Sequence, residues 1–221
     1  MDFRDLGNRR SIQRPSIEID DLTADDFTFH GEFDGDELLI DSSEFADVKG
    51  EGKLTGSLVR STDLSRSHLS PLKLSDVRFE YVDLSSASWQ GVKLHRAEIV
   101  RSRAMGFRIS LASAQDVYID GCRWDYATIH IEGVKGALVF NECLFREATI
   151  TGDLSNVVFR DCDLGGVEFE ANKAMNCDLT TSRVDEVARG LLGLRGARIT
   201  AEQAASAAIL IATEAGLTVT D

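Results

Sequence analysis

Apolar residues recur at every fifth position over a long central stretch of the chain. From Leu54 to Val139, all eighteen positions of this five-residue series are apolar, although apolar residues make up only 43% of the sequence. A helix repeats every 3.6 residues and a strand every two, so a period of five keeps to one face of neither element. The pattern therefore predicts a chain that turns a corner once in every repeat and stacks its turns into a solenoid.

A second feature accompanies each apolar centre. The residue two positions earlier is usually small, and an aspartate often comes directly before the centre, as in residues 61–65, 81–85, 151–155, 161–165 and 176–180. Over residues 20 to 185 this pattern resembles the pentapeptide-repeat family. The resemblance implies an all-β fold, a right-handed quadrilateral β-helix in which four five-residue sides make one coil. The centre and the small residue of each side would point into the column.

The pattern divides the chain into three parts. Residues 1–16 read as a loose N-terminal tail, and residues 17–185 as the β-helix, irregular to about 50 and regular from 54. Residues 186–221 form a C-terminal cap. Within the cap, Thr200 and Gln203 have the spacing of a capping box, which predicts a helix over about 201–215 that ends at Gly216. This helix has two interpretations, a lid on the open end of the solenoid and a dimerisation element, which is how some members of the family pair.

Two irregularities interrupt the repeat. The step becomes six residues after Val139 and four after Ile150, which we interpret as a bulged corner near Asn141 and Glu142. In addition, some centres, such as Ala104, are too small to fill the column. We expect Phe107, which is too large for its small-residue position, to point inward and fill that space.

One wall of the predicted column differs from the other three. Grouping the repeats by coils of twenty residues places six apolar side chains outward on the wall that is centred on Val59 and its successors. An apolar stripe of this kind predicts a surface for a protein partner or for a second copy of the chain. The alternative is that the N-terminal segment or the C-terminal helix folds over it. The candidate partner-binding residues are Leu58, Val100, Tyr118, Leu138, Phe140 and Val158.

The charge is strongly negative and unevenly distributed. The net charge is −13, and residues 1–50 hold 14 acidic and 5 basic residues, whereas residues 51–139 hold 10 and 12. Some pentapeptide-repeat proteins associated with quinolone resistance resemble duplex DNA and bind DNA gyrase, so the resemblance implies this type II topoisomerase as an alternative partner. The nearly neutral middle of the column argues against mimicry, because DNA carries a charge about every 1.7 Å. Direct binding to nucleic acid is not expected.

Neither the cysteines nor the histidines indicate a catalytic or metal site. Cys122, Cys143 and Cys162 occupy small-residue positions on one side of successive coils, so we expect buried thiols in a ladder rather than a metal site. The four histidines form no closely spaced pair, and no phosphate-binding loop or nucleophile motif occurs. A filled solenoid also lacks the concave pocket that catalysis usually needs. We therefore expect no enzymatic activity, no cofactor and no bound metal.

The sequence therefore predicts a non-enzymatic protein-interaction module of unknown partner that self-associates, with a homodimer as the candidate assembly. Inhibition of DNA gyrase by DNA mimicry is the alternative. No stretch near the N-terminus resembles a signal peptide, and the longest apolar stretch, residues 204–212, is too short to span a membrane. We expect a cytoplasmic location.

Overall fold

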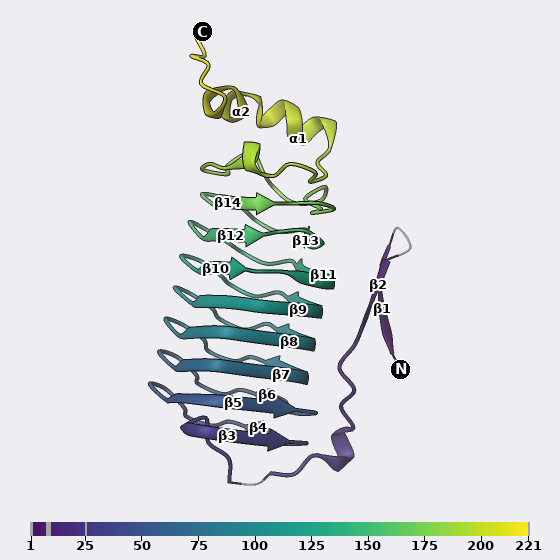
Figure 1. The fold of residues 1–221 in the computed structure, drawn as a ribbon, viewed down its shortest axis with the longest axis vertical. Helices are drawn as coiled ribbons and strands as arrows, with labels where there is room; N and C mark the ends of the chain where they lie inside the picture. The colour runs from purple at the N-terminus through teal and green to yellow at the C-terminus, as the bar shows by residue number, and fades with distance from the viewer. Residues whose placement is uncertain (1, 8–9, 25, 221) are drawn as a thin grey trace.

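The computed structural model describes residues 2–7, 10–24 and 26–220; residues 1, 8–9, 25 and 221 of the predicted tail, column and cap lie outside this part. Twelve strands form one sheet that winds as a β-solenoid of about seven turns, with a two-stranded hairpin beside the column and short helices at one end (Figure 1). The predicted fold class, an all-β quadrilateral β-helix with a helical C-terminal segment, is confirmed.

The strands of the column are short at both ends and long in the middle. In the first half they are β3 (Gly31–Asp36), β4 (Leu39–Asp41), β5 (Lys49–Thr55), β6 (Leu58–Arg60), β7 (His68–Glu80) and β8 (Ser88–Val100). In the second half they are β9 (Arg108–Asp120), β10 (Thr128–Ile131), β11 (Val134–Asn141), β12 (Thr149–Asp153), β13 (Val157–Arg160) and β14 (Glu168–Lys173).

Every strand pair in the column is parallel, and the register repeats every twenty residues in the regular coils. Phe79 of β7 lies opposite Ile99 of β8, which in turn lies opposite Ile119 of β9. Equivalent apolar centres therefore stack directly on one another. This stacking buries their side chains almost completely and builds one continuous core along the column.

The corners of the coils require unusual backbone conformations. Ser61, Tyr81 and Arg101 occupy the same corner in successive coils, and their φ angles are 49°, 55° and 47°. Gly121 follows at this corner with φ 61°, and Glu142 comes next with φ 51°. The left-handed region is uncommon for residues other than glycine, so the stacked hydrogen bonds of neighbouring coils must hold these corners in place.

Aromatic side chains fill the column where the centres are small. Phe107 is fully buried, and its ring lies 5.3 Å from that of Trp89 and 5.7 Å from that of Trp124 between ring centroids. The indole N–H of Trp89 donates to the hydroxyl of Ser67 at 2.9 Å. The prediction that Phe107 points inward beside the undersized Ala104 is thus confirmed, because a void there would be costly in a close-packed interior.

The slip in the repeat lies earlier than the sequence indicated. Val134 pairs with Ala114 and Phe140 pairs with Ile119, with a shift of register between Lys135 and Leu138. The extra residue therefore lies within residues 135–138, and the apolar centre of this side is Phe140. The predicted bulge near Asn141 and Glu142 is wrong, because Glu142 occupies an ordinary corner of the coil.

The N-terminal segment is structured where the sequence suggested a loose tail. Strands β1 (Phe3–Gly7) and β2 (Arg10–Gln13) form an antiparallel hairpin, and the one-turn helix η1 (Ile19–Asp21) follows. Leu6 and Ile12 of this hairpin are buried. Their burial against the column gives the segment the apolar contact that an isolated hairpin lacks in water.

The C-terminal segment contains η2 (Leu191–Gly193), α1 (Ala201–Ser206) and α2 (Ala208–Glu214). Thr200 and Gln203 form the predicted capping box, with the backbone N–H of Gln203 donating to the Thr200 hydroxyl at 3.1 Å. The side-chain amide of Gln203 also donates to the carbonyls of Leu179 and Ser182 in the column. The helix is therefore docked on the last coil, as a lid would be, although it is divided into two at the buried Ala207.

Candidate functional site

The structure separates the six predicted wall residues into three groups. Tyr118 and Val158 lie on the outside of the column and are covered by the N-terminal hairpin. Leu58 borders a cleft beneath the segment that follows the hairpin, and Val100 is half-buried. The last two, Leu138 and Phe140, belong to the interior core.

Leu138 and Phe140 were expected to point outward, and this expectation is wrong. The ring of Phe140 lies 5.4 Å from that of Phe159 and 5.9 Å from that of Trp124, both inside the column. The cause is the extra residue within 135–138, because a shift of one residue moves every following side chain to the opposite face. Val139, expected as an inward centre, points outward instead.

The N-terminal hairpin covers this wall through a small apolar cluster. Leu6 and Ile12 of the hairpin are buried together with Tyr118, Ala137, Val139 and Val158 of the wall. The guanidinium carbon of Arg4 lies 3.8 Å from the centroid of the Tyr118 ring, which is a close cation–π contact. This is the covered-wall alternative that the sequence left open, with the hairpin as the cover.

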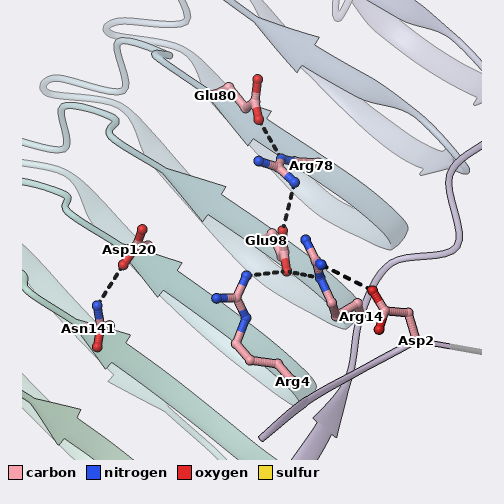
Figure 2. Close-up of polar contacts among 8 residues, drawn as sticks. All are labelled: Asp2, Arg4, Arg14, Arg78, Glu80, Glu98, Asp120 and Asn141. Atoms are coloured by element: carbon pink, nitrogen blue, oxygen red, sulfur yellow. Dashed lines mark hydrogen bonds and ion pairs between the residues drawn. The ribbon is translucent and has the colours of Figure 1, made fainter. Parts of the chain in front are cut away.

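A buried carboxylate joins the hairpin to the wall. The side chain of Glu98, on β8, is 2% exposed and contacts three arginines (Figure 2). Arg4 and Arg14 approach its Oε1 at 3.0 and 3.1 Å from the hairpin side, and Arg78 approaches its Oε2 at 3.2 Å from β7. The hydrogen bond to Glu98 raises the pKa of Arg14 above its ordinary value.

Two of these arginines also carry partners of their own. Arg78 contacts Glu80 at 2.5 Å, and Arg14 contacts Asp2 at 3.1 Å (Figure 2). The cluster therefore alternates acid and base across the junction. Because a buried charge is costly unless it is paired, Glu98 holds the hairpin in place only while both hairpin arginines stay within reach.

The segment after the hairpin has a second attachment. The backbone N–H of Ser16 donates to the carboxylate of Asp76 at 2.9 Å, and Arg96 pairs with the same carboxylate. Burial acts to raise the pKa of Asp76, but the hydrogen bonds from Arg96 and Ser16 outweigh it and hold the pKa below its ordinary value. Between this segment and the wall lies a cleft of about 570 Å³, which Glu98 and Leu58 help to line.

The sequence reasoning missed both the cleft and Glu98. It expected a filled column without a hollow, whereas the N-terminal segment creates one by arching over the wall. A partial signal was present, because the pair Gly7-Asn8 is typical of a hairpin turn and has an apolar residue, Leu6 or Ile12, on each side.

Within residues 2–7, 10–24 and 26–220, no group of three or more His, Cys, Asp or Glu side chains is arranged to hold a metal ion. Across the same residues, none of the helices is both long and apolar enough to cross a membrane.

The small inward residues form a column of their own. Cys122, Cys143 and Cys162 are buried and free, and burial beside the two neighbouring thiols raises the pKa of Cys143. Ser102 precedes them and Ser182 follows, and each hydroxyl accepts a hydrogen bond from the backbone N–H one coil earlier. Each side thus contributes one large and one small inward residue, and each regular coil contains twenty residues. The chain has the pentapeptide-repeat fold.

Comparisons with known proteins find only distant similarities. No family model and no curated protein matches the sequence. Among solved structures, a trypsin-treated variant of QnrB1, a plasmid-mediated fluoroquinolone resistance protein, is similar with 19% identity and a TM-score of 0.47 over 84% of this chain and 99% of that one. HetL, a pentapeptide repeat protein involved in heterocyst differentiation regulation from the cyanobacterium Nostoc sp. strain PCC 7120, is 15% identical with a TM-score of 0.29, over 77% and 84%.

Proposed function

We propose that the protein is a non-enzymatic interaction module in which the hairpin-covered wall pairs two copies by exchange of their N-terminal hairpins. The observation that carries this proposal is Glu98, a carboxylate held by two arginines of the hairpin and one of the wall. A second copy presents the same two arginines with the same spacing. Exchange therefore satisfies the buried charge as well as the closed monomer does, whereas in the open state the carboxylate keeps only Arg78 and loses both hairpin arginines.

The modest size of the junction supports exchange. Among the described side chains of the hairpin, Leu6 and Ile12 alone are buried, whereas Phe3 remains more than half exposed. Residues 14–28 connect the hairpin to the column, and η1 is the one helical element among the described residues of this stretch. A chain of about fifteen residues reaches up to roughly 50 Å when extended, which is enough for a hairpin to settle on a neighbouring column.

Cross-linking between two variants tests the exchange. Leu6→Cys and Val158→Cys place one thiol on the hairpin and one on the wall, within the same pocket. The two variants, carrying tags of different size, are mixed, incubated at high concentration, diluted and oxidised. We expect a disulfide-linked heterodimer. This product should be absent when either variant is mixed with a matched Glu132→Cys variant, because Glu132 is an exposed residue directly after β10. A heterodimer yield no higher than this control would contradict the proposal.

Inhibition of DNA gyrase by DNA mimicry remains the alternative, and it requires a different distribution of charge on the surface. Mimicry needs sustained negative potential, whereas Arg60, Arg78 and Arg160 lie along the hairpin-covered wall. Inhibition of supercoiling by sub-micromolar protein would replace the exchange proposal with this alternative. For location we propose the cytoplasm, whose reducing conditions would keep the adjacent thiols of the column free.

A further inference from the structure

A second wall of the column carries almost all the lysines. The chain has six lysines, and five of them flank the apolar centres of the wall that runs from Leu54 through Leu74 and Leu94. The sixth, Lys49, begins β5, and the other permanently charged cations of the column are arginines. The five lysines are Lys53, Lys73, Lys93, Lys135 and Lys173.

Three of these lysines lie in consecutive layers at the same position. Lys53 of β5 pairs in register with Lys73 of β7, and Lys73 pairs in register with Lys93 of β8. Parallel strands lie about 4.8 Å apart, so the side chains leave the wall as a ladder of like charges. Like charges directly opposite one another destabilise a sheet, so this arrangement gains nothing for the fold.

The ends of this ladder are neutralised and its middle is not. Lys53 contacts Asp34 at 3.0 Å. Lys173 lies in register with Asp153; burial acts to raise the pKa of that carboxyl, but hydrogen bonds from Ser155, with a smaller contribution from the charge of Lys173, lower it. Lys73, Lys93 and Lys135 have no acidic partner within 4.0 Å in the described part of the chain.

Two arginines at other positions of the column behave differently. Arg60 contacts Asp41 at 2.8 Å and Arg66 contacts Asp47 at 2.7 Å, in each case one coil away. At these two positions the charge of the arginine is balanced by an acid of the neighbouring coil. The central lysine row lacks such a balance, and an anion from solution can supply it.

The three unpaired lysines surround a hollow. Ser113 of β9 stands where the ladder would place its next lysine, and the centre beside it is the undersized Ala114. The short side chains leave a pocket of about 230 Å³. Its polar lining comes from Lys73, Lys93, Lys135, His95, Ser75, Ser113 and Gln115.

We propose that this hollow, the lysine pocket, binds a small phosphorylated anion of the size of a diphosphate. Ammonium groups, hydroxyls and a side-chain amide can donate hydrogen bonds to phosphate oxygens. The volume corresponds to about eight water molecules at roughly 30 Å³ each, which suits a compact group. A long polyanion would be repelled by the net charge of −13 and by the acids beside Lys53, which are Glu32, Asp34 and Glu51. A small anion would interact mainly with the nearby lysines, because charges farther away are screened.

Titration calorimetry with inorganic pyrophosphate tests the site on the full chain. We expect saturable binding with one equivalent, and at least a tenfold loss of affinity in the double variant Lys73→Gln, Lys93→Gln. Both side chains are exposed, so the variant should keep its fold, which circular dichroism checks. Lys173→Gln, on the same wall at the far end, is the matched control and should bind as the wild type does.

Several results would overturn the proposal. They are no binding at millimolar pyrophosphate, an equal loss in Lys173→Gln, or binding of single-stranded oligonucleotide at least tenfold tighter than pyrophosphate, which would assign the wall to nucleic acid. ADP distinguishes the sources of the ligand. Equal affinity for ADP and pyrophosphate assigns the pocket to the diphosphate group, and a tenfold preference for ADP assigns it to a nucleoside diphosphate.

Discussion

The column and the N-terminal hairpin are both made of β-strands, but they are held in different ways. In the column, identical sides stack in register, so each apolar centre is covered by the coil above and the coil below. The hairpin buries two apolar residues and depends on a charged cluster around Glu98. A repeated apolar core favours one arrangement of the column, whereas a short polar junction can be opened and remade. We therefore expect the stability of the fold to come from the column, and this difference supports the proposed exchange of the hairpin.

The largest effect is expected from removing an aromatic ring of the column. Phe107→Ala should lower the free energy of unfolding by about 3–5 kcal/mol, because the ring fills space between two tryptophans that neighbouring side chains cannot occupy. Urea unfolding followed by tryptophan fluorescence measures this. Phe3→Ala, at an exposed position of the hairpin, is the control and should change the value by less than about 0.5 kcal/mol. Equal losses would remove the distinction between the two regions.

A smaller and more local effect is expected at Glu98. Glu98→Gln removes the charge that two hairpin arginines share, so the hairpin should open more often while the column keeps its stability. The cost to the junction should be about 1–3 kcal/mol, since the arginines are about one-third exposed and regain water on release. Hydrogen exchange of residues 3–6 should accelerate by roughly ten-fold or more. Glu132→Gln is the control, and equal exchange in both variants would assign no anchoring role to Glu98.

The same contrast explains what could be predicted from the sequence. The column repeats, so each position is supported by its equivalents twenty residues away, and the inward role of Phe107 followed from that register. The hairpin occurs once, and its contacts join residues that are 84 and 94 positions apart. No local pattern reveals which acid an arginine will meet across such a distance. The misplaced slip had a related cause, because Val139 and Phe140 are both apolar and only the pairing with Ile119 distinguishes them.

The pH dependence of the hairpin sharpens the comparison further. The pKa of Asp76 is lower in the folded protein than its ordinary value of 3.8, so its contribution is fully present above that value and is lost as the pH falls through the lower, folded value. Protection of the segment around Ser16 should therefore remain constant from pH 7 to 5 and decline below pH 3.8.

Limited digestion with pepsin between pH 2 and 4.5, normalised to an unstructured peptide, measures that decline. Asp76→Asn should flatten the pH dependence of cleavage after the hairpin, because the group that titrates is gone. Asp41→Asn is the matched control, since the pKa of Asp41 is also lowered, by Arg60, but Asp41 does not contact the segment. A flattened profile in the control would mean that general acid unfolding, rather than Asp76, governs release.

The smallest effect should be found at the cysteines of the column. Burial raises the pKa of Cys177 to about 12, so its thiolate is scarce at neutral pH, and its sulfur is shielded from reagents as well. Native protein at pH 8 should react with a thiol reagent at none of its four cysteines within an hour, whereas Phe3→Cys in the hairpin should react at once. The reaction of the four native thiols then reports opening of the column alone. If they react as fast as the hairpin thiol, the column opens as readily as the hairpin, and the division between a stable column and an exchanging hairpin fails.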